Sequence, residues 1–81
     1  MGAPFAIKIV GPSGTDWYLD DSAEQSTYSE RQRFPSQDIA DDFLALPWPI
    51  TSKKPIHGNN VRKHYRRAGY VVQVVNVEDG E

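Results

Sequence analysis

The 81-residue chain contains six serines, two histidines and several aspartates, which are residue types that act as nucleophile, base and orienting group in covalent catalysis. It contains no cysteine. Without thiols, disulfides, zinc–thiolate sites and cysteine nucleophiles are excluded. There is no Gly-x-Ser-x-Gly elbow, and Gly11-Pro12-Ser13-Gly14 lacks the Gly-Lys-Ser/Thr end of a phosphate-binding loop. That stretch has the composition of a hairpin turn instead. We therefore predict no catalytic residue, no metal site and no cofactor, and hence no enzyme.

The two histidines, His57 and His64, lie seven residues apart in a segment that superficially resembles histidine–asparagine–histidine nuclease motifs. Such nucleases need a two-stranded ribbon before the helix and further metal ligands. Here a basic linker precedes His57, and no carboxylate lies near in sequence. Surface histidines are the simpler interpretation, and a hydrolase using His57 or His64 stays open only as a third functional class.

The acidic residues of interest are adjacent or closely spaced: Asp20 with Asp21, and Asp38 with Asp41 and Asp42. Neighbouring residues in a helix point about 100° apart, so such pairs do not converge on one atom for acid–base catalysis. They predict an acidic patch that attracts a basic partner, or else an ordinary solvated face.

The basic segment is the most specific feature of the sequence. Residues 51–70 contain no acid, whereas residues 1–50 carry eight acids against three bases. The cations that form this predicted binding patch are Lys53, Lys54, Arg62, Lys63, Arg66 and Arg67. If each met a phosphate, binding would weaken with salt at a log–log slope of about −5. The alternative is a solvated helix face that balances the acidic half of the molecule.

Three segments predict a β-hairpin and a further strand. Residues 5–10 alternate, with Phe5, Ile7 and Ile9 on one face, and the strand pattern resumes at residues 17–19 after a turn. Residues 70–77 are apolar on both faces, typical of a central or covered strand. If this strand is instead added beside the hairpin, it lies at an edge, and an apolar edge invites pairing with another chain, so we expect either a monomer or a homodimer through residues 70–77.

Two helices are predicted between the strands. Residues 37–46 place Ile39, Ala40, Phe43, Leu44 and Leu46 at helical spacing, with Ser36 as N-cap and Pro47 as the stop. Residues 61–68 follow Asn60 as N-cap and precede Gly69, with Val61, Tyr65 and Ala68 facing inward. Nothing specifies an element in residues 20–33. The expected fold is α+β: a three-stranded sheet packed by one or two helices, in the order ββααβ.

Length and composition set the scale of the molecule. A chain of 81 residues with 38% hydrophobic and 25% charged residues is one domain spanning 1–81. We expect a flexible N-terminus over residues 1–4 and an acidic tail over 78–81. No apolar run is long enough for a membrane span and no signal peptide is present, so we expect no membrane contact and a cytoplasmic protein.

Large aromatic side chains are the candidate interface anchors. Trp48 stands in the proline-rich segment 47–50, where we expect it to fill the seam between sheet and helix. Trp17 and Tyr28 are the other candidates, although tryptophans in so small a protein more often belong to the core.

The layout resembles small phage- and prophage-encoded accessory proteins. The residues that carry the likeness are the hairpin end Asp16-Trp17-Tyr18-Leu19, the helix start Arg33-Phe34-Pro35-Ser36-Gln37-Asp38-Ile39-Ala40, and the strand after Ala68-Gly69-Tyr70. The resemblance implies a non-catalytic protein that binds a host factor, in the manner of anti-CRISPR proteins or polymerase inhibitors. The expected function is therefore binding to a host protein or nucleoprotein machine; the alternative is nucleic-acid binding through the basic segment 53–67.

Overall fold

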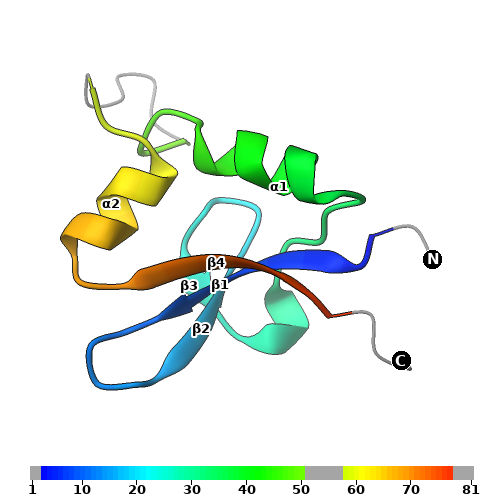
Figure 1. Ribbon diagram of the computed structural model, residues 1–81, viewed down its shortest axis with the longest axis horizontal. Coiled ribbons are helices and arrows are strands. Elements are labelled where there is room, and N and C mark those ends of the chain that lie inside the picture. The colour runs from blue at the N-terminus through cyan, green and yellow to red at the C-terminus, as the bar shows by residue number, and fades with distance from the viewer. Residues whose placement is uncertain (1–2, 51–57, 78–81) are drawn as a thin grey trace.

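The computed structural model describes residues 3–50 and 58–77. Its strands are β1 (Phe5–Val10), β2 (Asp16–Leu19), β3 (Gln25–Ser26) and β4 (Val71–Asn76), and its helices are η1 (Tyr28–Glu30), α1 (Gln37–Leu44) and α2 (Val61–Arg67) (Figure 1). The α+β class is confirmed, but the predicted three strands in the order ββααβ are wrong. The additional short strand β3 and the 3-10 helix η1 lie inside residues 20–33, where no element was expected.

The four strands form one antiparallel sheet in the order β3-β2-β1-β4. The hairpin is confirmed, with Ile9 opposite Trp17 across β1 and β2. The C-terminal strand lies beside β1, with Ile9 opposite Val72 and Ile7 opposite Val74. Of the two predicted positions for this strand, the edge is therefore the observed one.

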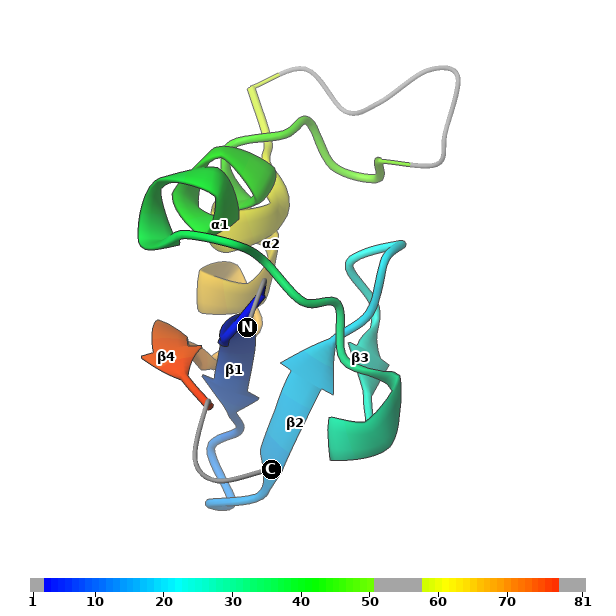
Figure 2. The same ribbon diagram turned by 90° about the vertical axis from the view of Figure 1, so that its right-hand side faces the viewer.

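The helices α1 and α2 lie on the same side of the sheet, as Figures 1 and 2 show. The core forms between these layers, because alternate residues of the strands face the helices. The fully or nearly fully buried residues of this core are Ile7, Ile9, Leu19, Ala23, Phe34, Ala40, Leu44, Val61 and Tyr65. Trp17 and Trp48 are partly buried against it.

Local signals set the start of each helix as predicted, and a glycine follows α2, whereas α1 ends at Leu44 rather than at the predicted Leu46. The backbone N–H of Ile39 donates to Ser36 Oγ at 3.3 Å, and that of Lys63 donates to Asn60 Oδ1 at 2.8 Å. Gly69 follows α2 with a φ of +94°, a conformation that favours glycine. Both N-caps and the terminating glycine are therefore confirmed.

Three of the predicted inward residues are exposed instead. Ile39 and Leu46 keep 47% and 41% of their surface accessible, and Ala68 is also exposed. Each lies near or beyond a helix end: α1 stops at Leu44 and α2 at Arg67, so Leu46 and Ala68 leave the helical face. Ile39 stands in the first turn of α1, on a face that no other element covers fully.

Candidate binding surface on α2 and β4

The four basic residues of α2 lie in two stripes, because residues four apart share a face of a helix. Arg62 and Arg66 form the stripe toward β4, where both line a pocket. Lys63 and Arg67 form the other stripe and reach the chain before the helix: Lys63 Nζ donates to the Gly58 carbonyl and Arg67 to Asn59 Oδ1, each at 3.5 Å. The remaining members of the predicted patch, Lys53 and Lys54, lie outside the described residues, as does His57.

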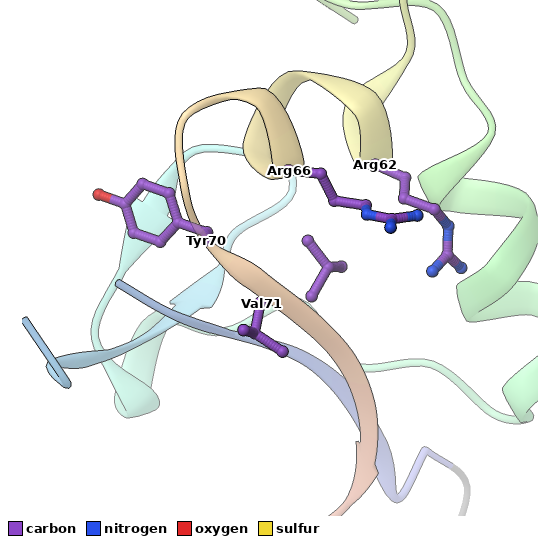
Figure 3. A pocket seen from close by; sticks show the side chains of 5 residues that line it. Arg62, Arg66, Tyr70 and Val71 are labelled. Atoms are coloured by element: carbon purple, nitrogen blue, oxygen red, sulfur yellow. The ribbon is translucent and has the colours of Figure 1, made fainter. Parts of the chain in front are cut away.

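A pocket of about 380 Å³ opens where α2 meets the start of β4. Arg62 and Arg66 line it from the helix, and Tyr70, Val71 and Val72 line it from the strand. In Figure 3 the side chains of the two arginines run in the same direction above β4. The pocket thus combines two guanidinium groups with an apolar floor, to which Val72 contributes from the helix-covered face of the sheet. Figure 3 also shows that the Tyr70 ring turns away from the arginines and that Val71 lies on the other side of the strand.

The two arginines differ in how they are neutralised. Arg62 contacts Asp41 of α1 at 3.4 Å, and the two side chains are 40% and 45% exposed. An exposed ion pair of this kind contributes about 0–1 kcal/mol, so it holds Arg62 only loosely. No ion pair or hydrogen bond joins the Arg66 side chain to any residue that the structure describes. Of the two pocket arginines, Arg66 therefore has more to gain from an anion.

The outer edge of β4 carries backbone groups directed away from β1. The Val77 N–H donates to the Pro4 carbonyl at 2.7 Å. Antiparallel pairs alternate between bonded and non-bonded, so the pairs Ala6–Val75 and Lys8–Gln73 are bonded and the pair Ile7–Val74 is not. By the same alternation the N–H and C=O groups of Val72 and Val74 point outward from the sheet.

The acidic residues of the predicted patch stand on two segments, the turn between β2 and β3 and the helix α1. Asp20 accepts the backbone N–H groups of Ser22 and Glu24, at 2.9 and 3.0 Å, and so shapes the turn between β2 and β3. Asp21 is exposed in that turn, whereas Asp38, Asp41 and Asp42 stand on α1. Asp38 lies in the first turn of α1, where the helix dipole stabilises an anion, and Asp41 contacts Arg62.

Trp48 fills a seam, but against α2 rather than the sheet. Its indole stacks on the His64 ring at 3.9 Å between centroids and meets the Tyr65 ring edge-on at 5.7 Å. Burial in this stack lowers the pKa of His64 from its usual value of 6.5. The stack gives His64 a packing contact between α2 and the proline-rich segment 47–50.

Tyr28, unlike the partly buried Trp48, is an exposed aromatic, and its contact with Tyr18 places it on the face of the sheet without α1 and α2. Its ring is 42% exposed and meets the Tyr18 ring edge-on at 5.3 Å. The Arg31 guanidinium carbon lies 3.8 Å from the centre of the Tyr28 ring, a cation–π contact. Tyr28 is thus held in place by its own neighbours, away from the pocket of α2 and β4.

Comparisons with protein families, curated proteins and solved structures give no match to this chain. Among residues 3–50 and 58–77, no group of three or more His, Asp or Glu side chains could hold a metal ion. Nor is any helix in that part of the chain long and apolar enough to cross a membrane.

Sequence reasoning found the arginines of the pocket but missed its floor. Tyr70, Val71 and Val72 were assigned only to a strand, since nothing local shows that α2 returns over the strand that follows it. The signal that was available is the short connection: only Ala68, Gly69 and Tyr70 separate α2 from β4. So short a link keeps the last turn of the helix beside the first residues of the strand.

Proposed function

We propose that this chain is a non-catalytic binding domain that docks an acidic segment of a larger protein on α2 and the start of β4. The observation that carries this proposal is the pocket: Arg66, which has no ion pair with a described residue, and the loosely paired Arg62 line it together with the apolar Val71 and Val72 at the start of β4. Guanidinium groups bind carboxylates through two parallel hydrogen bonds, and an apolar floor accommodates the aliphatic part of an acidic side chain. A host factor, as the resemblance to phage accessory proteins implies, is one partner of this kind.

Nucleic-acid binding is the second candidate, and the four cations of α2 favour it. Phosphate backbones are met by rows of cations spread along a surface rather than by one pocket. Lys63 and Arg67 form such an additional stripe, so a nucleic acid would use both stripes of the helix. An acidic protein segment seated in the pocket would use only Arg62 and Arg66.

A matched pair of double variants separates the two candidates. Arg62→Gln/Arg66→Gln removes the pocket stripe, and Lys63→Gln/Arg67→Gln removes the same charge from the other stripe. Binding of a labelled oligoglutamate peptide and of a short DNA duplex is measured by fluorescence anisotropy. We expect the pocket variant to weaken peptide binding about 10- to 100-fold, the value of one or two charge-assisted hydrogen bonds, and the control variant to change it less than about threefold.

Equal losses for both variants, together with tighter binding to DNA than to peptide, would contradict the proposal and support nucleic-acid binding. Circular dichroism of each variant checks that the helix remains folded. All four side chains are at least partly exposed, so their substitution leaves the core intact.

A further inference from the structure

The pocket adjoins the outer edge of β4, which pairs with no other described strand, and Val72 belongs to both. Its side chain lies in the pocket lining, and its backbone N–H and C=O point outward from the sheet. An extended segment that hydrogen-bonds to this edge would therefore pass directly beside Arg62 and Arg66. We propose that the acidic partner binds as an additional β-strand on β4, with one carboxylate in the pocket; this inference rests on the proposed function.

The pleat of the sheet fixes where the carboxylate must stand. Residues directly opposite in neighbouring strands point their side chains to the same face. Val72 and Val74 share the helix-covered face with Ile9 and Ile7, their partners in β1. The partner residue opposite Val72 thus points toward Arg62 and Arg66, and the residue opposite Val74 points toward the partly buried apolar surface.

A sequence preference follows for the partner: an acidic residue and an apolar residue two positions apart, in an otherwise extended segment. The intervening residue faces the opposite side of the sheet, with Gln73 and the exposed Val71, and is free to be polar. Backbone hydrogen bonds would supply affinity for any extended chain, and the carboxylate would supply selectivity.

Charge argues for a partner other than a second copy of this chain. The residues of β4 are Val, Val, Gln, Val, Val and Asn, with no carboxylate among them. Two β4 strands paired with each other would leave Arg66 opposite neutral side chains. An acidic strand neutralises it and buries the exposed Val71 as well.

The test uses the full chain and a labelled, end-capped short peptide of alternating valine and threonine, in which one central valine is replaced by glutamate. A peptide with glutamine in place of the glutamate is the charge control. In two further peptides every second amide is N-methylated. One peptide carries the methyl groups along one edge of the strand, and the other carries them along the opposite edge. Affinities are measured by fluorescence anisotropy with the parent protein, with Arg66→Gln and with Val74→Pro.

The Val74→Pro variant is chosen for its place in the ladder. The Val74 N–H points away from β1, so proline there removes a hydrogen bond to the partner and none to β1. Gln73→Ala, whose side chain lies on the face without helices, is the matched control. Circular dichroism shows whether Val74→Pro remains folded, and the methylated peptides test the same point without altering the protein.

We expect Arg66→Gln and the glutamine peptide each to weaken binding about 10- to 100-fold, as for a lost charge-assisted hydrogen bond. Val74→Pro and one of the two methylated peptides should abolish binding, and Gln73→Ala should bind as the parent does. Which methylated peptide fails gives the direction of the added strand, parallel or antiparallel to β4.

Other outcomes separate this inference from the function on which it rests. If the charge changes weaken binding but folded Val74→Pro and both methylated peptides behave as the parent, strand addition is wrong and acidic docking stands. If only the strand changes matter, or no peptide binds, the carboxylate site is wrong. A dimer in sedimentation that Val74→Pro dissociates would identify a second copy as the occupant and overturn the inference.

Discussion

Tyr65 joins two segments that lie far apart in the chain. Its hydroxyl donates to the carbonyl of Ala23 at 2.6 Å, across 42 positions of sequence. The bond holds the β2–β3 turn, in which Ala23 adopts a φ of +62°, against the helix that carries the binding surface. Without it, the carbonyl of the buried Ala23 would lose its partner.

Tyr65→Phe should therefore lower the free energy of unfolding by about 1–3 kcal/mol, the cost of leaving a buried acceptor unsatisfied. Urea unfolding followed by circular dichroism measures the change. Tyr18→Phe is the matched control, because no hydrogen bond joins the Tyr18 hydroxyl to a described residue. Equal stabilities for the parent and Tyr65→Phe would contradict a structural role for this bond.

Tyr65 also makes the free energy of unfolding depend on pH in the alkaline range. Burial, with the negative charges of Glu24 and Asp20, raises the pKa of Tyr65 to about 12. An unfolded tyrosine ionises near pH 10, so between pH 10 and 12 the unfolded state loses its proton first and is stabilised relative to the folded state. We expect stability to fall across that range in the parent and to fall less steeply in Tyr65→Phe, as measured by urea titrations at each pH.

Single residues were predictable where their role is local. Ser36 and Asn60 were identified as N-caps because the bond that each accepts comes from only three positions along the chain. The stack of Trp48 on His64 was not predictable, since it joins a loop and a helix that only the tertiary fold brings together. The same limit applied to Arg62, whose partner Asp41 lies on another helix.

Among the elements, long amphipathic patterns predicted structure and a short polar one did not. The hairpin, both helices and the last strand were identified from apolar spacing. β3 has two residues, Gln25 and Ser26, and is held by backbone pairing to Leu19 and Tyr18. Such a strand has no hydrophobic alternation, so the sequence of residues 20–33 gave no sign of a fourth strand.

The edge position of β4 predicts an alternating pattern of amide hydrogen exchange. The N–H groups of Val71, Gln73 and Val75 point toward β1, and those of Val72 and Val74 point outward. We expect the first three to exchange at least about tenfold more slowly than the last two, because outward amides need no opening of the sheet. Exchange followed by NMR measures this, and equal protection of all five amides would show that the edge is already covered.

At the scale of the whole molecule, one small core holds the fold together. The chain has 81 residues, for which the total stability is about 4–12 kcal/mol. Leu44 is fully buried between α1 and the sheet, whereas Leu46 is 41% exposed just beyond the helix. The two leucines therefore form a matched pair for testing where the core ends.

Leu44→Ala should cost about 2–5 kcal/mol, a large part of the total, and Leu46→Ala much less than that. Thermal and urea unfolding of both variants measures the difference. Similar costs for the two substitutions would contradict the assignment of the core. The acidic half of the chain and the basic segment were evident from sequence, but the pocket was not, since it arises only where α2 packs over β4.

The two outer strands of the sheet are unequal, and this limits how the sheet can grow. A filament built by strand pairing needs two usable edges on every copy, one at each end of the sheet. β3 has only two residues, whereas β4 has six. Any extension through β4 therefore ends after one step, and even two copies meeting there would form a closed pair. The molecule can expose an apolar edge for recognition without providing the second edge that polymerisation requires.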